Sequence, residues 1–470
     1  MKQYKLYVGG NFAETSTPLE VINPYTQKTF ATTFLAGEKE LEYAIEKAIA
    51  LRNELISMSS YERYEILMQI ANEIKANRSY LAEVLCEESA KPIKYALIEI
   101  ERAAQTFIIA AEETKRLPKE YISLDWTDAG KGKEGLVKHF PVGLVAGIAP
   151  FNFPLNLAVH KIAPAIATGC PIILKPASST PLSTLELAKI IDKTNLPKGA
   201  VSILPMNRMI GNKLVTDGRF KLISFTGSPE VGWEMKKNGG KKKVVLELGG
   251  NAAVIVTPSA NIDLAVQKSV VGGFAYSGQV CIHAQRFYVH ESVFEMFSTV
   301  FMDATKKLKF GNPLEGSTDI SSMIDEENAK RVELWIKEAV GKGAKVLLGG
   351  KRDGVNVEPT IITGSSKDMK VCAEEIFGPV VVLEKYEKIE EAVEFVNDSK
   401  FGLQAGIFSD VLSEIDFVFS RLEVGGIIVN DVPTFRVDHM PYGGVKDSGL
   451  GREGVKYAML DMLEPKILVK

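Results

Sequence analysis

The sequence predicts an α/β protein made of two doubly wound lobes and a helical layer. From Gly143 onwards, short β-branched runs alternate with stretches long enough for helices, as is typical of a parallel sheet covered on both faces. A second α/β region follows the first. The chain of 470 residues also exceeds what one hydrophobic core usually serves. We therefore expect two lobes with a cleft between them.

The first predicted elements are helices, between residues 38 and about 115. Apolar residues recur there at helical spacing among Glu, Lys and Arg side chains. The spacing is clearest at Leu67, Ile70, Ile74, Leu81, Val84 and Leu85. This pattern predicts a packed helical layer that carries no catalytic residues.

Both lobes are expected to contain short strands separated by helices. The predicted strands of the first lobe are 144–148, 171–174, 201–204, 222–225 and 244–246. Those of the second lobe are 252–256, 287–289, 346–348, 380–383 and 405–408, with helices at 263–271 and 327–340. The segment 123–134 is polar and loop-like, and 136–140 is strand-like. We expect this piece to leave the body of the subunit and to meet another chain.

Charge and composition exclude several classes of function. The formal net charge is −3, which offers no basic field for nucleic acid or an anionic membrane, and the basic run at 236–243 is explained by a solvated turn. The four cysteines lack C-x-x-C spacing and the five histidines form no H-E-x-x-H pair, so we expect neither disulfides nor a metal. Because no signal or membrane-spanning segment is apparent, we expect a cytoplasmic protein.

Glycine-rich segments match the G-x-G-x-x-G pattern of dinucleotide sites at 130–135 and 449–454. The first leads into an extended run, and the second leaves too little chain for a βαβ unit, so neither has the required context. The turn 225–232 is a better candidate, because Ser228 can cap a helix that begins with Pro229 after a strand. On this pattern alone, a structural turn and a phosphate-binding turn are equally supported.

Three residues have chemistry to offer, and each also has an ordinary structural explanation. Cys281 follows a glycine-containing approach that can present a thiol at a turn, although an isolated cysteine is more often an inert core residue. Glu247 interrupts an apolar strand, where burial suits a general base, and a structural carboxylate is as common there. Asn152 lies between prolines at a strand end, where an amide either donates to an oxyanion or forms a turn.

Six motifs give these residues a shared context. They are PFNFP at 150–154, KPAS at 175–178, FTGS at 225–228, LELGGN at 246–251, GQVC at 278–281 and EEIFGP at 374–379. With these motifs the chain resembles the aldehyde dehydrogenase superfamily, from Asn23 to the C-terminus. The stretch 436–454 looks most like the lactaldehyde and glyceraldehyde-3-phosphate members.

The resemblance implies NAD(P)-dependent oxidation of an aldehyde to the carboxylic acid. Cys281 would attack the aldehyde carbon and form a thiohemiacetal, then a thioester, while Asn152 and the Cys281 N–H hold the oxyanion. Glu247 would activate the water that hydrolyses the thioester. Relatives that pass the acyl group to coenzyme A generally lack this glutamate. A coenzyme A-acylating enzyme and a catalytically silent structural relative stay open as alternatives.

The resemblance also implies an NAD or NADP site. Lys175 resembles the lysine that contacts the adenine-side ribose, and Gly227 and Ser228 lie at the pyrophosphate turn. The remaining expected cofactor-binding residues are Ile148, Phe151, Ser178, Leu248, Glu375 and Phe377, the last two at the nicotinamide ribose and ring. NAD-preferring relatives often carry a glutamate where this chain has Ser178. Without that charge, we expect dual or NADP-leaning use.

Two positions that are bulky aromatics in many relatives' substrate tunnels are His160 and Arg436 here. A cationic, hydrogen-bonding pocket should prefer a small, polar or anionic aldehyde. A structural salt bridge from Arg436 to Asp438 or to a neighbouring subunit is an equally supported alternative.

By resemblance, the chain should contain two Rossmann-like doubly wound lobes and a β oligomerisation arm. Residues 1–122 and 141–246 would form the cofactor-binding domain, and residues 247–430 the catalytic domain. Residues 123–140 and 431–470 would form the arm and the C-terminal tail. A homodimer or homotetramer follows from the same resemblance.

Overall fold

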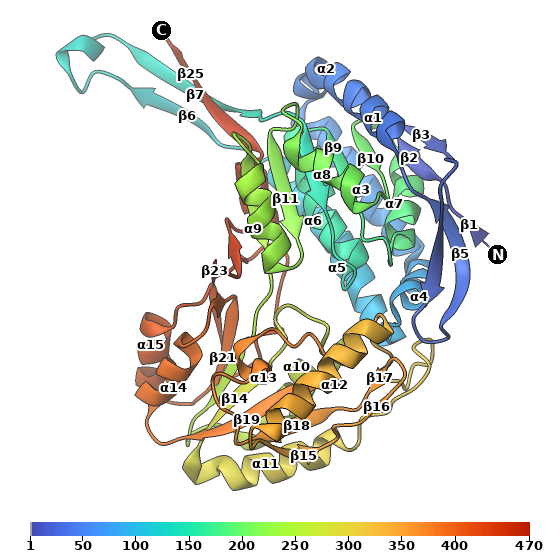
Figure 1. Cartoon of the computed structure of the whole chain (residues 1–470). Helices are drawn as coiled ribbons and strands as arrows, with labels where there is room; N and C mark the ends of the chain where they lie inside the picture. The colour runs from blue at the N-terminus through green and yellow to red at the C-terminus, as the bar shows by residue number, and fades with distance from the viewer. Residues whose placement is uncertain (1) are drawn as a thin grey trace.

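The chain folds into two α/β lobes, one above the other in Figure 1, and a thin arm that projects from the upper lobe. The computed structural model describes residues 2–470. The upper lobe holds the N-terminal half of the chain, drawn from blue to green, and the lower lobe holds the yellow-to-orange half. The predicted fold class is confirmed.

An eight-stranded sheet forms the first lobe, in the order β24-β12-β11-β8-β9-β10-β2-β3. The strands from β12 to β10 pair in parallel, whereas β24 and β2 pair antiparallel with their neighbours. All five strands predicted for this lobe are present. The bounds are β2 Leu6–Val8, β3 Asn11–Ala13, β8 Val145–Ile148, β9 Ile172–Lys175, β10 Val201–Ile203, β11 Leu222–Thr226, β12 Lys243–Glu247 and β24 Gly449–Leu450.

The strand order changes direction between β8 and β11. The chain runs outward from β8 through β9 to β10, then returns to the other side of β8 for β11 and β12. Loops at the carboxyl ends of two such strands diverge, and ligands bind in the crevice between them. The residues after β8 and those after β11 therefore flank one crevice.

Helices cover both faces of this sheet, and the predicted helical layer is confirmed. In one core, the helices α3, α4, α5, α6, α7 and α16 pack against one face of the sheet. In another, α1 and α8 pack against the opposite face. Helix α3 begins where Ser59 and Glu62 cap each other reciprocally. The bounds are α1 Glu38–Ala50, α2 Arg52–Ser57, α3 Ser60–Ala76, α4 Arg78–Ser89, α5 Ile93–Thr114, α6 Pro154–Thr168, α7 Leu182–Asp192, α8 Arg208–Thr216, α9 Pro229–Asn238 and α16 Val455–Asp461.

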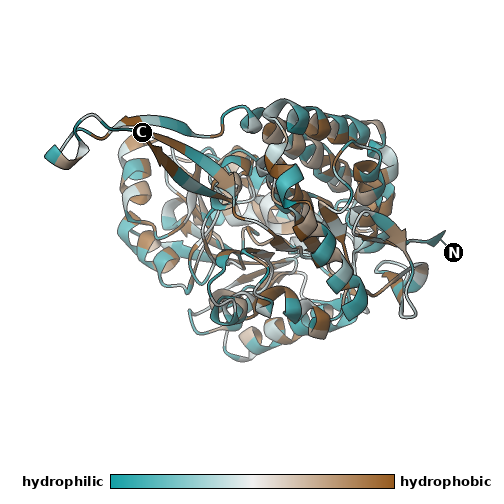
Figure 2. Ribbon diagram, turned by 90° about the horizontal axis from the view of Figure 1, so that it is seen from above, coloured by the Kyte–Doolittle hydropathy of each residue, from teal (hydrophilic) through white to brown (hydrophobic). Residues whose placement is uncertain are grey.

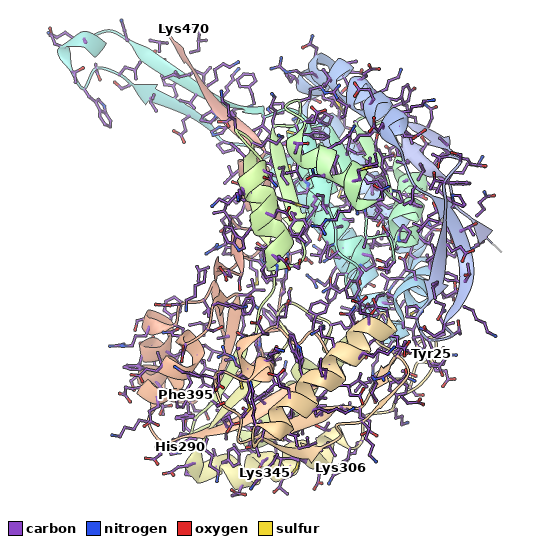
Figure 3. All side chains as sticks on the ribbon, in the orientation of Figure 1. Tyr25, His290, Lys306, Lys345, Phe395 and Lys470 are labelled. Carbon is purple, nitrogen blue, oxygen red and sulfur yellow. The ribbon has the colours of Figure 1, made fainter. Side chains whose placement is uncertain are left out.

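The second lobe contains a seven-stranded sheet in the order β15-β18-β19-β14-β13-β21-β22. The five predicted strands and both helices are present, but the prediction omitted β18 and β22. In Figure 3, His290, Lys345 and Phe395 mark this lobe. The bounds are β13 Ala253–Val256, β14 Arg286–His290, β15 Lys345–Leu348, β18 Thr360–Thr363, β19 Val380–Tyr386, β21 Gln404–Phe408, β22 Gly426–Val429, α10 Ile262–Phe274, α11 Glu291–Thr305, α12 Glu326–Gly341, α13 Lys370–Ala373, α14 Ile389–Asn397 and α15 Leu412–Arg421.

The arm is a three-stranded antiparallel sheet of β6 (Lys119–Ser123), β7 (Glu134–Pro141) and the C-terminal β25 (Leu463–Val469). Figure 2 shows its tip extending well beyond the body. The glycine pattern 130–135 lies in this arm, after the short helix η1 (Asp128–Gly130), and leads into a strand instead of a helix. It therefore lacks the geometry of a phosphate loop, as predicted.

The C-terminal segment ties the two lobes together before it enters the arm. Strand β24 pairs with β12 of the first lobe, and β23 (Val445–Lys446) pairs with β20 (Phe401–Gly402) of the second. The remaining strands are β1 Lys2–Gln3, β4 Pro18–Asn23, β5 Lys28–Phe34, β16 Arg352–Asp353 and β17 Asn356–Val357. Across residues 2–470, no helix is both long and apolar enough to cross a membrane.

Phe287 gives a direct test of the second lobe's core. Its fully buried ring packs against Phe297 and Phe301, with centroids 6.3 and 5.4 Å away. Phe287→Ala should leave a cavity and lower the free energy of unfolding by about 3–5 kcal/mol, measured by urea unfolding. Phe419→Ala, at a side chain that is 71% exposed, is the control and should cost under about 0.5 kcal/mol. Equal losses in both variants would contradict this packing.

Candidate active site

Loops from distant parts of the chain meet between the lobes. Asn152 follows β8, and Cys281 follows the short helix η2 (Ala275–Gly278) of the second lobe. The Asn152 side-chain amide donates to the carbonyl oxygen of Gln279 at 3.1 Å. Packing at Gly250 is also tight, since a Cβ there would lie 2.7 Å from the Cys281 carbonyl oxygen. The fold therefore brings the expected nucleophile and the expected oxyanion donor to the same place.

A strained turn presents Cys281. Tyr276, Ser277 and Gly278 have φ values of 50°, 53° and 67°, in the left-handed region that side chains rarely adopt. A Cβ at Gly278 would collide with the carbonyl oxygen of Gly378, so only glycine fits there. Ser277 Oγ donates to the Ser321 carbonyl oxygen at 2.5 Å and helps to hold this conformation. Strain of this kind persists only where the surrounding structure enforces it.

The thiol of Cys281 borders a cavity of about 220 Å³ between the lobes. Its Sγ lies 3.2 Å from the hydroxyl of Tyr442. Burial raises the pKa of Cys281 to about 11, and the Tyr442 hydrogen bond works against that rise. The same cavity is lined by Arg102, Phe153, Asn156, Tyr276, Arg436 and Tyr442.

Glu247 is a buried carboxylate, and neither of its oxygens has a hydrogen-bond partner within residues 2–470. Its Oε1 lies beside Gly443, where a Cβ would be 2.7 Å away, and Gly443 directly follows Tyr442. Burial, and then the charge of Glu453, raise the pKa of Glu247 well above its usual range. Such a carboxylate accepts a proton more readily than one in water.

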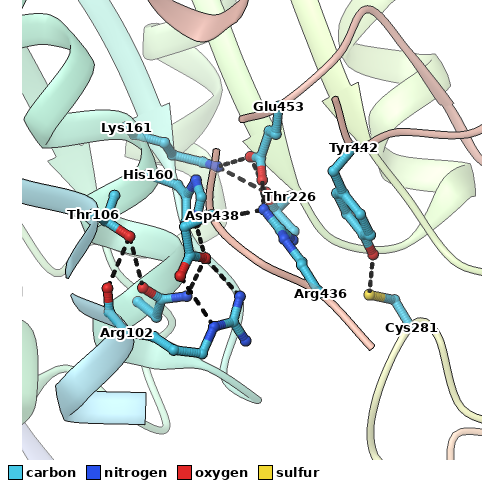
Figure 4. A network of polar contacts seen from close by, with 11 residues as sticks. Arg102, Thr106, His160, Lys161, Thr226, Cys281, Arg436, Asp438, Tyr442 and Glu453 are labelled. Atoms are coloured by element: carbon cyan, nitrogen blue, oxygen red, sulfur yellow. Dashed lines mark hydrogen bonds and ion pairs between the residues drawn. The ribbon is translucent and has the colours of Figure 1, made fainter. Parts of the chain in front are cut away.

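A buried ionic network surrounds Glu453, as Figure 4 shows. Lys161 of α6 donates to Thr226 Oγ1 at 2.7 Å and to Glu453 at 3.1 Å. Arg436 contacts the other Glu453 oxygen at 3.0 Å. Burial opposes the charge of Glu453, but these two cations outweigh it and lower its pKa to about 2. Glu453 therefore stays ionised, while the pKa of the neighbouring Glu247 moves the opposite way.

A second cluster is centred on Asp438. Arg102 of α5 donates to its two oxygens at 2.6 and 3.2 Å, and His160 Nε2 lies 2.8 Å from it. Burial opposes the charge of Asp438, but His160 and Arg102 hold its pKa far below the usual range. Burial lowers the pKa of His160, which leaves its ring neutral near pH 7.

The two expected substrate residues are therefore placed differently. Arg436 lines the cavity beside Cys281, and its ion pair is with Glu453, not with Asp438. His160 is held by Asp438 behind the cavity lining. Arg102 and Tyr442 also line the cavity, and the sequence analysis singled out neither. Arg102 lies in a helix that was predicted only to pack, and Tyr442 lies in the stretch 436–454, where it was given no role.

A larger cavity of about 600 Å³ opens at the carboxyl ends of β8 and β11. Ile148, Lys175 and Ser178 line it, as does Arg208, which the sequence analysis missed. Helix α9 begins here with Ser228 at its N-cap, as predicted. The free N–H groups of its first turn suit a phosphate, and the cavity volume suits a nucleotide.

Other expected cofactor residues lie in the loops after β11 and β12 and in the loop before β19. The Gly227 N–H donates to the Glu247 carbonyl oxygen at 3.0 Å, so this glycine serves the turn itself. Leu248 packs under Gly232 of α9. Glu375 accepts from the Gly250 N–H at 2.9 Å, and burial raises its pKa to about 7.

Two aromatic rings, one from each lobe, contact each other. The rings of Phe151 and Phe377 meet edge to face, with centroids 5.7 Å apart. Phe377 has a φ of 45°, a second strained position in the segment that faces the thiol loop. The expected nicotinamide-side residues thus come from both lobes and contact each other.

Comparison with known proteins agrees with this geometry. A 3-sulfolactaldehyde dehydrogenase from Priestia aryabhattai is 44% identical over 471 residues, covering 100% of this chain and 98% of that protein. A lactaldehyde dehydrogenase from Methanococcus aeolicus is 40% identical, covering 96% of this chain and 97% of its own.

Solved structures show the same similarity. Aldehyde dehydrogenase 21 from Physcomitrella patens, in complex with the reaction product succinate, superposes with a TM-score of 0.98 at 48% identity, covering 100% of this chain and 98% of that one. Glyceraldehyde-3-phosphate dehydrogenase GapN from Methanocaldococcus jannaschii, complexed with NADP, gives 0.92 at 39% identity, covering 96% and 98%. The sequence profile of the aldehyde dehydrogenase family matches residues 12–468. This chain therefore belongs to the aldehyde dehydrogenase family of NAD(P)-dependent oxidoreductases.

Proposed function

We propose that this enzyme oxidises a small anionic aldehyde to the free carboxylic acid, with Cys281 as nucleophile and Glu247 as base. The observation that carries the proposal is a buried carboxylate, Glu247, that has no hydrogen-bond partner within residues 2–470 and whose charge acts on the Cys281 thiol. Two oxyanion donors are available at the same thiol. Asn152 uses one amide hydrogen on Gln279, and the N–H of Cys281 makes no hydrogen bond within residues 2–470. Both can therefore donate to an oxygen that becomes negative.

In the first step, the Cys281 sulfur bonds to the aldehyde carbon and the carbonyl electron pair moves onto oxygen, where both donors stabilise the charge. A nicotinamide held at Glu375 and Phe377 would supply the hydride acceptor for that carbon, and loss of the hydride would leave a thioester on Cys281. Glu247 then takes a proton from a water molecule whose oxygen attacks the thioester carbon. The bond to sulfur breaks, which releases the acid and the Cys281 thiolate.

The structure supports water over coenzyme A as the acyl acceptor. Glu247 has the raised pKa and the free oxygens that a base for water needs. Coenzyme A brings its own thiol and needs no such base. A catalytically silent relative, in turn, would not need a thiol on a strained turn, a base and an oxyanion donor in one site.

Glu247→Gln tests the hydrolytic step, because glutamine keeps the shape but cannot accept a proton. Rapid mixing should show about one equivalent of reduced cofactor per active site, followed by steady turnover lower by about 10²–10⁴-fold. Glu295→Gln, at a side chain that is 81% exposed, is the matched control. Unchanged steady turnover would remove Glu247 as base. Full rescue by coenzyme A, but not by water, would favour the acyl-transfer alternative.

Surplus positive charge at the cavity supports an anionic substrate. Three cations, Lys91, Arg102 and Arg436, line the cavity with one carboxylate, Glu99. Asp438 and Glu453 pair with the two arginines but do not line the cavity. The buried Nε of Arg436 has no hydrogen-bond acceptor within residues 2–470. A carboxylate or sulfonate at the far end of a small aldehyde supplies that acceptor.

The comparisons fit an anionic substrate. One similar protein is named for 3-sulfolactaldehyde, and one similar structure holds succinate. His160 would act on such a substrate indirectly. Its hydrogen bond holds the Asp438 carboxylate, which in turn holds the Arg102 guanidinium in place.

Arg436→Leu tests the charge preference with 4-oxobutanoate and its neutral methyl ester. The ratio of kcat/KM for the acid over the ester should fall about 10–100-fold, the range expected for one lost charged hydrogen bond. The ester serves as an internal control for general damage to the site. Arg116→Leu, at a side chain that is 60% exposed, should leave the ratio unchanged. If the acid-to-ester ratio of kcat/KM is unchanged in Arg436→Leu, the proposed anion site is refuted.

The cavity near β9 supports dual or NADP-leaning cofactor use. Ser178 places no negative charge against a ribose phosphate. Arg208 lines the same cavity with an 87% exposed side chain, paired only weakly with Glu234 at 3.4 Å. A guanidinium in this position suits the extra phosphate of NADP. Similar structures hold either NADP or NAD⁺.

Ser178→Glu should shift the enzyme towards NAD, because a carboxylate repels the phosphate but can accept from ribose hydroxyls. We expect kcat/KM for NADP to fall at least about 10-fold while that for NAD is kept, measured in parallel assays. Ser178→Ala separates the charge from the loss of the hydroxyl. Strict use of NAD by the unaltered enzyme would show that Ser178 and Arg208 do not admit the phosphate.

The arm supports self-association. Tyr121 and Trp126 are 68% and 89% exposed on it, and Ile467, Leu468 and Val469 are about half exposed on β25. An apolar, projecting sheet edge of this kind is typical of a surface that another chain covers. We assign the arm strands to a homodimer or homotetramer contact.

A further inference from the structure

The Tyr442 hydroxyl is bonded to the reactive sulfur and to no other side chain. It lies 3.2 Å from Cys281 Sγ, and this is its single hydrogen bond within residues 2–470. The residue is only 2% exposed. Main-chain hydrogen bonds to Glu453, at 2.9 and 2.6 Å, fix the residue from behind. The guanidinium of Arg436 stacks on the ring at 3.7 Å from its centroid.

The direction of the hydrogen bond follows from which group keeps its proton. Burial, and then the neighbouring thiol, raise the pKa of Tyr442 well above its usual value. Tyr442 is therefore a neutral donor and not a base for the thiol. A hydroxyl that donates to a thiolate stabilises the charged form of sulfur, and charge-assisted bonds of this kind are stronger than neutral ones.

We propose that Tyr442 is a further catalytic residue, which holds Cys281 as a thiolate by donating a hydrogen bond to its sulfur. This inference rests on the proposed role of Cys281 as nucleophile. On ionisation the sulfur gives its proton to water, and Tyr442 keeps its own. When the sulfur bonds to the aldehyde carbon, the negative charge passes to the carbonyl oxygen and the contact with Tyr442 weakens. The hydroxyl thus acts on the free enzyme, before the oxyanion donors are needed.

The other charged groups around the sulfur divide into two kinds. Glu375 and Glu247 disfavour a thiolate, whereas Arg436 favours it. Arg436 lies over the Tyr442 ring, so the cation and the hydroxyl approach the sulfur from one side. Unlike these three charged groups, Tyr442 has a hydrogen bond to Sγ within residues 2–470. Removing its oxygen changes no formal charge.

The Tyr442 hydrogen bond should change both the pKa of the Cys281 thiol and the rate at which this thiol reacts. One charged hydrogen bond corresponds to a thiol pKa shift of about one unit or more. Lowering the pKa by one unit gives about tenfold more thiolate below the midpoint but makes each thiolate about threefold less nucleophilic. The net gain from Tyr442 is therefore about threefold per pKa unit, a rate effect that a thiol-specific assay resolves.

The test is the pH dependence of Cys281 alkylation by iodoacetamide in the cofactor-free enzyme, followed by peptide mass spectrometry. Tyr442→Phe keeps the ring and its stack on Arg436 and removes only the oxygen. The midpoint for Cys281 should move up by about one pH unit or more, and alkylation below both midpoints should slow about threefold. The matched control is Tyr386→Phe, outside the site, which removes a buried hydroxyl bonded to the Val256 carbonyl oxygen at 3.2 Å. Cys372 reports general exposure in the same digests.

An unchanged or lowered midpoint in Tyr442→Phe would overturn the inference, as would an equal rise in Tyr386→Phe. A rise specific to Tyr442→Phe supports it. Turnover of Cys281→Ser separates this from the proposed function. If Cys281→Ser is inactive and the midpoint does not move, only the role of Tyr442 fails. If Cys281→Ser keeps full turnover, the proposed nucleophile fails.

Discussion

The ion pair between Lys161 and Glu453 is the contact on which the site depends. It joins α6 of the first lobe to a C-terminal segment 292 residues away, and both side chains are buried. Buried charges are costly unless paired, so this contact also requires Arg436 and Thr226 around it. The same segment carries Tyr442 to the thiol and covers Glu247. Without it, the carboxylate would be solvated and the sulfur would lose its donor.

This network assigns different states to two neighbouring carboxylates. Glu453 has two cations and stays ionised, whereas Glu247 has no hydrogen-bond partner within residues 2–470 and a raised pKa. Environments that push the pKa values of two acids apart are how one site holds both a structural anion and a base. Opposing effects also act on the pKa of the Cys281 thiol, since burial opposes its ionisation while Tyr442 and Arg436 favour it. In the resting protein the base thus has no hydrogen-bond partner within residues 2–470, whereas the thiol has one in Tyr442.

Most of the fold was predictable because its signals are local. The parallel strands are short apolar runs between helix-length stretches, and the motif residues around Asn152 and Cys281 lie next to the turns that position them. What the sequence could not give were contacts between distant segments. Arg102 reaches Asp438 across 336 positions and Tyr442 reaches Cys281 across 161. No periodicity reports such pairs, and for the same reason the ion pair of Arg436 with Glu453 was not among the alternatives weighed for this arginine.

The most direct test of the account is the covalent state of Cys281 during turnover. Enzyme quenched with acid while it oxidises 4-oxobutanoate with NADP can be digested and its cysteine peptides weighed. The account predicts that the peptide with Cys281 carries the added mass of the acyl group. An unmodified Cys281 during active turnover, or an acyl group found instead on Cys372, would contradict it.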